Sequence, residues 1–519
     1  MKKTIQIFAA LVVIVSGSCS VSQKQTTTDD GNIKVNFIQI NDVYEIAPIE
    51  AGKVGGMARV ATIKKELKAR NNNTYLLMAG DFLSPSVYNS LSYEGSRIRG
   101  KQMVDAMNAA KTDLVVFGNH EFDINEKELQ TCIDRSEFQW IASNSFNTTA
   151  NGAIPFGKWK NGVKTNFPET FLLSVSDEDG THATIGFIGI NLPFNKASYV
   201  SYTDPLATAI KLYEQIKDSC DVVIALTHQL IEDDIKLAKA LPNLGAIMGG
   251  HEHDMRFVKE GNVTISKAHA NARSAYIIEM KINKKSGKKS FRYTLKNVDD
   301  KIGKDSATHV VVQKWSDIAT ANYASLGFNA AEIVMAKGPT LDAREAMVRA
   351  GSTNFTKLVV NAMEAACPKA EIAIINAGSI RLDDLLTAPI TSFDIIRTLP
   401  FGGGMIELDM KGSLLNEILT AGKKNVGIGG FLQYSTSVKF DAIGQKWLYQ
   451  NIAIEDEKIF RVAVTDFLLT GGEANMGFLT KKNVGIVKIY PVSDASTALT
   501  NDIRLAIVDY MKKLFTVVR

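Results

Sequence analysis

Cysteine is scarce in this sequence, with four residues among 519, at Cys19, Cys132, Cys220 and Cys367. The three cysteines beyond Cys19 are widely spaced and form no Cys-x-x-Cys pair, which argues against a disulfide framework and a cysteine zinc site, so we expect buried free thiols. Blocks of basic residues are also missing, and the formal net charge is only +4 at pH 7. Such a chain does not favour nucleic acid as a partner.

The N-terminus lacks a membrane-spanning segment, because its apolar run from Ile5 to Val15 is too short to cross a bilayer as a helix. Two lysines precede this run and three small residues follow it, so residues 1–18 are expected to be a secretory signal. The small residues before Cys19 resemble a bacterial lipobox, in which Cys19 becomes the lipidated first residue of an exported protein. Simple cleavage is the alternative. Polar residues 19–31 would then form a flexible tether.

Glycine and proline are not in excess, and the composition, 45% hydrophobic and 22% charged, is that of a globular protein. The chain is too long for one ordinary core. Short apolar strands alternate with helical stretches in the first half, which predicts an α/β layered domain over residues 32–305, with central mixed β sheets flanked by helices. The polar, alanine-containing stretch 306–329 predicts a linker helix, and a second α/β domain is expected over residues 330–519.

Polar clusters follow five predicted strands at the point where each strand ends. They contain Asp42, Asp81, the hexapeptide Gly118-Asn119-His120-Glu121-Phe122-Asp123, His228, and Gly249-Gly250-His251-Glu252-His253. In α/β sheets, ligands gather at the carboxyl ends of the strands, so we expect these side chains to meet. Four of the seven histidines fall in these clusters, which scattered structural histidines would not do.

Each cluster taken alone has a structural alternative, since an aspartate after a strand is most often a helix cap or turn residue. Taken together and in this order, the clusters resemble the calcineurin-like metallophosphoesterases. The resemblance implies two divalent ions, of manganese, zinc, cobalt or iron, with Asp81 bridging them. It further implies that one site is completed by Asn119, His228 and His251, and that the other receives Asp42 and His253.

The chemistry of phosphate ester hydrolysis suits these residue types. Two cations roughly 3.5–4 Å apart polarise a phosphoryl oxygen and lower the pKa of a shared water. The resemblance makes His120 the group that stabilises the developing charge or protonates the leaving oxygen, and Asp123 would orient its imidazole.

Tyr44 departs from the family pattern, which usually has a histidine at this place. A neutral phenol with a pKa near 10 is a poor ligand for zinc or manganese, although a phenolate binds ferric iron. The Asp42 site is therefore expected to hold its metal weakly, to hold a different metal, or to be filled by water.

The second half carries a further set of motifs. These are Asn376-Ala377-Gly378-Ser379-Ile380-Arg381, Leu399-Pro400-Phe401-Gly402-Gly403-Gly404, Gly429-Gly430-Phe431-Leu432-Gln433 and the run from Asp466 to Glu473. In this order they resemble the C-terminal domain of the 5'-nucleotidase family.

This second resemblance implies a nucleotide-binding role. Phe401 and Phe467 would sandwich the base, and Asn376 and Arg381 would reach the nucleotide. For each phenylalanine the alternative is core packing. Glu473 stands where an aspartate typically holds ribose hydroxyls. The family's arginine before Ser352 is absent, and Arg349 lies two residues upstream of that place.

The sequence therefore predicts an exported, lipid-anchored enzyme of the 5'-nucleotidase type that hydrolyses nucleotide phosphate esters and releases nucleoside and phosphate. A UDP-sugar or a cyclic nucleotide is the alternative substrate. The alternative of another class is a surface nucleotide-binding protein with weakened catalysis, which Tyr44 and Gly351 would favour.

Overall fold

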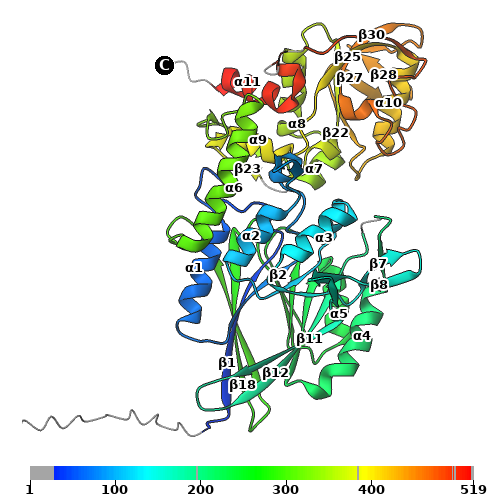
Figure 1. Cartoon of the computed structure of the whole chain (residues 1–519). Coiled ribbons are helices and arrows are strands. Elements are labelled where there is room, and N and C mark those ends of the chain that lie inside the picture. The colour runs from blue at the N-terminus through cyan, green and yellow to red at the C-terminus, as the bar shows by residue number, and fades with distance from the viewer. Residues whose placement is uncertain (1–28, 195–196, 383–384, 494, 496–497, 516–519) are drawn as a thin grey trace, which may run out of the picture.

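The structure is a computed structural model that describes residues 29–194, 197–382, 385–493, 495 and 498–515. Figure 1 shows two domains, between which the long helix α6 (Ser306–Ser325) runs. The expected signal over residues 1–18, the anchor residue Cys19 and the tether as far as residue 28 lie outside the described residues. Within the described ranges, no helix has both the length and the apolar character needed to cross a membrane.

The first domain is built on two six-stranded mixed sheets. The first sheet has the order β19-β18-β1-β2-β5-β6. Strands β1, β2, β5 and β6 run parallel, and β18 pairs antiparallel with both β1 and β19. Its strands are β1 (Asn32–Ile40), β2 (Thr74–Ala79), β5 (Leu114–Val116), β6 (Gln139–Ile141), β18 (Ser274–Asn283) and β19 (Lys289–Asn297).

The second sheet has the order β11-β12-β14-β15-β17-β16, with β12, β14, β15 and β17 parallel. Its strands are β11 (Thr170–Ser176), β12 (His182–Asn191), β14 (Val222–His228), β15 (Ala246–Gly250), β16 (Arg256–Glu260) and β17 (Val263–Lys267). The two sheets pack face to face, as the edge-on contact of the Phe37 and Phe187 rings shows, at 5.9 Å between centroids. Alternate β1 side chains, Ile33, Val35 and Phe37, lie in this inner core.

Helices cover the outer faces of both sheets. The first sheet is covered by α1 (Met57–Lys68), α2 (Lys101–Ala109) and α3 (Glu126–Arg135). The second is covered by α4 (Pro205–Ile216) and α5 (Ile231–Ala240). The predicted fold class, mixed sheets flanked by helices, is therefore confirmed.

Short strands make up small sheets and hairpins at the edges of the first domain. They are β3 (Ser92–Tyr93) with β4 (Ser96–Arg97), β9 (Gly157–Lys160) with β10 (Val163–Asn166), and the sheet of β13 (Val200–Tyr202), β7 (Ser145–Thr149) and β8 (Gly152–Pro155). Cys132 is a buried free thiol here, as expected, whereas Cys220 is partly exposed.

The second domain has a five-stranded sheet of order β26-β22-β30-β25-β31. Its strands are β22 (Ile372–Asn376), β25 (Met405–Lys411), β26 (Leu432–Tyr434), β30 (Ile459–Thr465) and β31 (Ile486–Ile489). One face packs against α8 (Asn354–Ala366), α9 (Ser392–Thr398) and α11 (Ile503–Phe515), and the other against α10 (Gly412–Lys424). Cys367, which directly follows α8, is a buried free thiol, as expected.

The remaining elements of the second domain are short. They are α7 (Glu345–Ala350), β20 (Ile333–Met335) with β24 (Ile390–Thr391), β21 (Leu341–Asp342) with β23 (Leu385–Leu386), and the sheet of β27 (Val438–Asp441), β28 (Lys446–Tyr449) and β29 (Ile452–Ala453).

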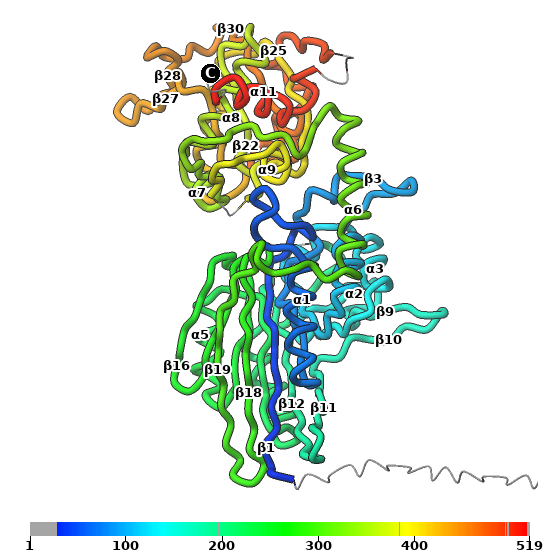
Figure 2. The backbone as a smooth tube through the Cα atoms, turned by 90° about the vertical axis from the view of Figure 1, so that its left-hand side faces the viewer, coloured from blue at the N-terminus to red at the C-terminus, as the bar shows by residue number. Residues whose placement is uncertain are grey.

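Helix α6 fixes how the two domains meet. In the first domain, the Trp315 indole N–H donates to Asp105 at 3.1 Å and the Tyr323 hydroxyl donates to the Val87 carbonyl at 2.8 Å. Both rings are buried in one apolar cluster that continues into α8, α9 and α11. Because that core is continuous, the second domain is held above the carboxyl end of β1, as Figure 2 shows.

Candidate metal centre and substrate cleft

The predicted ligands lie at the carboxyl ends of strands from both sheets. Asp42 and Asp81 follow β1 and β2, Asn119 follows β5, His228 ends β14 and His251 follows β15. Hydrogen bonds join the residues that follow strands of the first sheet to those at the ends of strands of the second sheet. The His228 Nδ1–H donates to the Ala79 carbonyl at 2.7 Å, and the His251 backbone N–H donates to Asp42 Oδ2 at 2.9 Å.

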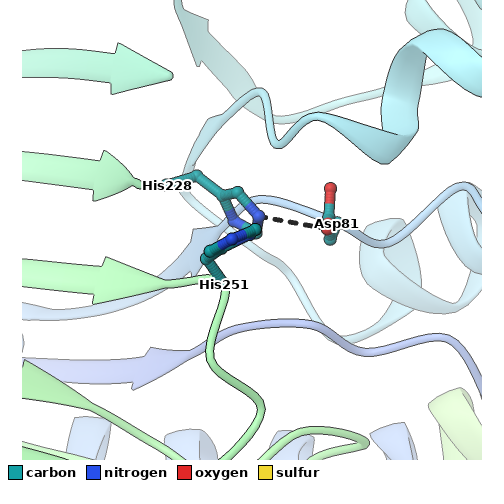
Figure 3. A group of neighbouring side chains, drawn as sticks. All are labelled: Asp81, His228 and His251. Carbon is teal, nitrogen blue, oxygen red and sulfur yellow. Dashed lines mark ion pairs between the residues drawn. The ribbon is translucent and has the colours of Figure 1, made fainter. Parts of the chain in front are cut away.

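Two groups of ligand-type side chains share Asp81. One is Asp81, His228 and His251, drawn in Figure 3, and the other is Asp42, Asp81 and His253. Within each group the donor atoms lie within 4.8 Å of one another. Asp81 Oδ2 is 3.0 Å from His228 Nε2, and Asp42 Oδ1 is 3.3 Å from His253 Nε2. A carboxylate common to both groups has the two oxygens that bridging requires.

Asn119 belongs to the same region. It is 2% exposed and directly precedes His120, whose backbone N–H donates to Asp81 Oδ1 at 2.8 Å. All six predicted ligands are therefore brought together at one edge of the sheet pair.

Buried acceptor atoms show that this centre fits metal ions. In the neutral form of His228, the bond to the Ala79 carbonyl, which can only accept, places the proton on Nδ1 and turns the Nε2 lone pair toward Asp81. His228 Nε2 and Asn119 Oδ1 are buried and find no hydrogen-bond partner among the described residues. Unsatisfied buried acceptors facing carboxylates are what a cation would satisfy.

The electrostatics of the centre point the same way. Burial lowers the pKa of His228, but Asp81 and Asp42 raise it by more, to about 9. Burial and the neighbouring His228 cation lower the pKa of His251 to about 4. Two buried carboxylates thus require positive charge nearby, from a proton or from metal ions.

The turns that carry the ligands have unusual backbone conformations. Asp42, Asp81, His251 and His253 have φ angles of 53°, 55°, 96° and 59°, in the left-handed region that non-glycine residues rarely adopt. Gly118 lies against the turn that carries Asp81, and a side chain at position 118 would collide with Asp81 Oδ1. Strained residues of this kind cluster at functional sites, where the surrounding fold holds them in place.

Tyr44 lies inside the centre. Its hydroxyl is 2.8 Å from His253 Nε2, 3.4 Å from Asp81 Oδ2 and 3.5 Å from Asp42 Oδ1. An ion held by Asp42, Asp81 and His253 would therefore meet the phenol oxygen.

His120 and Asp123 face the centre from the short helix that follows β5. His120 Nδ1 is 2.6 Å from Asp123 Oδ2. Burial lowers the pKa of His120, but the Asp81 and Asp123 carboxylates raise it by more, so the pKa lies above the ordinary value. Arg381 of the second domain places its Nη2 3.9 Å from Asp123 Oδ2, so side chains of both domains meet at Asp123.

Glu121 has a role that the sequence analysis missed. Its fully buried carboxylate accepts the backbone N–H groups of Gly118, Asp81, Phe82 and Leu83, at 2.6–3.0 Å. These bonds fix the turn that holds Asp81, the residue common to both ligand groups. The position of Glu121 within the hexapeptide 118–123 was the one feature of the sequence that could have indicated this role.

Lys267, at the end of β17, was also missed. Its fully buried ammonium lies 2.7 Å from Asp234 Oδ2 and 2.7 Å from Glu252 Oε2, and it donates to the Gln229 carbonyl at 2.6 Å. Gln229 follows His228, and Glu252 stands between His251 and His253. The lysine thus touches the turns that carry all three histidines predicted as ligands.

Two arginines of the second domain meet at Glu345 of α7. Arg381 Nη1 donates to Glu345 Oε1 at 2.9 Å, and Arg349 Nη2 donates to the same oxygen. Arg349, predicted only as a substitute for the missing arginine, is therefore beside Arg381. A small cavity of ≈ 30 Å³ between these residues and the metal centre is lined in part by Tyr44, His120, Glu345 and Arg381.

The other predicted nucleotide contacts lie nearby in the second domain. Asn376 Nδ2 donates to Glu473 Oε2 at 2.7 Å. Phe401 and Phe467 are 59% and 44% exposed, so core packing is wrong for both rings. Arg381 lies over the Phe401 ring, 5.8 Å from its centroid. Exposed aromatic faces beside hydrogen-bonding side chains suit a flat, polar ligand.

Comparisons with known proteins agree with this geometry. Residues 35–255 match the family model for calcineurin-like phosphoesterase, and residues 332–480 match that for the 5'-nucleotidase C-terminal domain. The chain is 22% identical over 546 residues to the snake venom 5'-nucleotidase of Naja atra, covering 93% of this chain and 97% of that protein. It is 24% identical over 468 residues to the trifunctional nucleotide phosphoesterase protein YfkN of Bacillus subtilis, covering 80% of this chain but only 31% of that protein.

A solved structure shares the whole fold. The crystal structure of a 5'-nucleotidase precursor from Thermus thermophilus has a TM-score of 0.65 with 21% sequence identity, and the match covers 93% of this chain and 97% of that chain. Both domains, in the same order, are therefore present here. With its metallophosphoesterase domain followed by a 5'-nucleotidase C-terminal domain, the chain belongs to the 5'-nucleotidase family and is a hydrolase of the metallophosphoesterase type.

Proposed function

We propose that this protein hydrolyses phosphate esters of nucleotides at a centre of two divalent ions, releasing phosphate. The observation that carries the proposal is that two ligand groups sharing Asp81 lie beside His120, within reach of Arg381 from the nucleotide-binding domain. The ions would be drawn from manganese, zinc, cobalt and iron. They would be held by Asp42, Asp81, Asn119, His228, His251 and His253.

The ions, when bound, would supply positive charge that polarises the phosphoryl group. His120 would donate a proton to the leaving oxygen or stabilise the charge on the reacting phosphate. Asp123 supports this role, because its carboxylate orients the ring and keeps the imidazole protonated at higher pH than usual. Arg381 would bind the phosphate after exchanging its contact with Glu345 for the substrate.

We also propose that residues 330–519 form the substrate-binding domain, joined by residues 306–329 to the metal-binding domain at 32–305. Phe401 and Phe467 would stack on the base, and Asn376, Glu473 and Arg349 would contact the ribose and phosphate. The exposed rings and the Asn376–Glu473 hydrogen bond support these roles.

The direct test is an assay of purified protein on AMP, UDP-glucose and a cyclic nucleotide, after metal removal and reloading with manganese, zinc or cobalt. Phosphate release from AMP that depends on added metal supports the proposal. Turnover of only UDP-glucose, or of only the cyclic nucleotide, would instead support that compound as the alternative substrate. Nucleotide binding by calorimetry without turnover under any metal would instead support the weakened binding protein.

Tyr44 gives a sharper prediction about metal affinity. A neutral imidazole is a better ligand for zinc or manganese than a phenol, so Tyr44→His is expected to tighten the weaker of the two metal sites by about tenfold. Metal titration followed by calorimetry measures the change, with Tyr93→His, on the β3 hairpin, as the control. An unchanged affinity would show that the phenol is already an adequate ligand.

The exported location is also a proposal. A secretory signal over residues 1–18 and a lipidated Cys19 would display the enzyme in the periplasm or on an outer membrane. The similar venom enzyme is named for a secreted fluid, which is compatible with export. Labelling cells with a radioactive fatty acid tests the anchor, because Cys19→Ser should abolish incorporation.

A further inference from the structure

An arginine-lined cavity lies between the domains, next to the metal centre. Its volume is ≈ 400 Å³, within the range of small-molecule sites. Arg97 and Arg99 line it from the first domain, and Arg381 and Phe401 line it from the second. Figure 2 shows the β3 hairpin, which leads into Arg97, beside α6 at the level where the domains meet.

This cavity adjoins the smaller cavity at the metal centre. Both cavities are lined by Pro85 and Arg381, so they are neighbours on either side of the Arg381 side chain. Asp123, which holds His120, lines the larger cavity on the side of the metal centre.

The charges in the cavity favour an anion. Three arginines line it against one carboxylate, Asp123. Arg99 is partly offset by Glu128, with Nε 3.3 Å from Oε1, whereas Arg97 donates only to the Ser90 carbonyl and forms no ion pair with a described carboxylate.

We propose that Arg97 and Arg99 bind a second phosphate of the substrate, so that the preferred substrate is a nucleotide with two linked phosphates. This inference rests on the proposed function. Water would add to the terminal phosphorus, and the bond from that phosphorus to the bridging oxygen would break. One water proton would stay on the released inorganic phosphate and the other would go to solvent. The leaving nucleoside monophosphate would keep the bridging oxygen and its electron pair, and its charge would fall within the arginine cavity. Guanidinium groups bind such oxygens bidentately.

The test compares ADP with AMP, which differ only in the second phosphate. In the double variant Arg97→Gln/Arg99→Gln, kcat/KM for ADP is expected to fall by about tenfold or more, with less than about threefold change for AMP. Arg292→Gln, a charge change on the exposed face of β19, should alter neither value. Equal losses on both substrates, or no loss on ADP, would overturn the inference.

A binding measurement separates this inference from the proposed function. Calorimetry with the non-hydrolysable α,β-methylene analogue of ADP gives an affinity even if the protein turns over no nucleotide. About tenfold weaker binding to the double variant than to the wild type would support the subsite. Equal affinities would reject it. Arg97→Gln alone, at an exposed position, provides a folded variant if the loss of the Arg99–Glu128 pair destabilises the protein.

A second inference comes from the buried lysine. We infer that Lys267 is a positioning residue for the metal centre, because one ammonium contacts the turns of His228, His251 and His253. Lys267→Met keeps every predicted ligand side chain but should loosen the turns that position them, weakening metal binding by about 10–100-fold, the range found for residues that support ligands. Lys64→Met removes another buried lysine, paired with Asp113 away from the centre, and serves as the control.

Cobalt binding distinguishes positioning from general stability. The visible spectrum of bound cobalt reports ligand geometry, and it should change in Lys267→Met but not in Lys64→Met. Asp234→Asn keeps the side-chain volume and weakens the same ion pair, so it serves if the methionine variant does not fold. Unchanged cobalt spectra and affinities in both Lys267→Met and Asp234→Asn would refute the positioning role.

Discussion

Replacing Asp81 by asparagine is expected to remove metal from both sites and to lower kcat by about 10³-fold or more, since metal ions contribute several kcal/mol of charge stabilisation. Among the described residues, Asp81 is the one common to both ligand groups. Asparagine keeps the acceptor for the His120 backbone N–H but loses the charge and one of the two metal-binding oxygens. Metal content by mass spectrometry and steady-state kinetics measure the two effects.

The pattern of loss distinguishes bridging from simple coordination. Asp42→Asn changes a ligand of one group only and should retain about half of the bound metal. Asp509→Asn, on the exposed side of α11, should retain all of it. Full metal occupancy in Asp81→Asn would contradict a shared carboxylate, whatever the effect on rate.

The sequence predicted the metal centre because its information is local. A ligand that directly follows a parallel strand is placed by the strand itself, and parallel strands end at a common edge. Asp42, Asp81 and His228 could be placed this way. Tyr44 could be recognised as a departure, but the distance of its hydroxyl from His253 depends on how two turns fold over each other.

Lys267 and Glu121 show what such reasoning misses. A lysine at the end of a strand indicates a solvated side chain, because charged residues are seldom fully buried without partners. The partners of Lys267, Asp234 and Glu252, come from α5 and from the turn after β15, so only the assembled sheet creates the buried ion pairs. Likewise, Glu121 accepts N–H groups from a segment about forty residues away.

The contact between the two domains could not be predicted from the sequence either. The motifs predicted that Arg381 reaches a nucleotide, but not that it approaches Asp123. That approach follows from the packing of α6 through Trp315 and Tyr323, which sets the second domain over the metal centre. Arg349 was placed near the substrate only by its sequence distance from a missing arginine, and its shared contact with Glu345 needed the folded helix α7.

Replacing His120 by alanine is expected to lower kcat by about 10²–10⁴-fold, the usual contribution of a positioned acid or base. The imidazole faces the centre, but it belongs to neither ligand group, so both metal ions should still bind with wild-type stoichiometry. Metal analysis beside kinetics therefore separates this variant from Asp81→Asn. Near-normal kcat with full metal would discard a catalytic role for His120.

The pH profile then tests what Asp123 does. A proton donor works while it is protonated, and Asp123 helps to hold the pKa of His120 above its ordinary value. Asp123→Asn should lower the pKa of His120. The descending alkaline limb of the kcat profile should therefore lie at lower pH than in the wild type, while the acidic limb stays in place. If the descending limb does not move, or disappears only with metal loss, His120 stabilises charge without donating a proton. In that case His120→Ala should still lower kcat more than Asp123→Asn at neutral pH, because the imidazole itself carries the larger share of the effect.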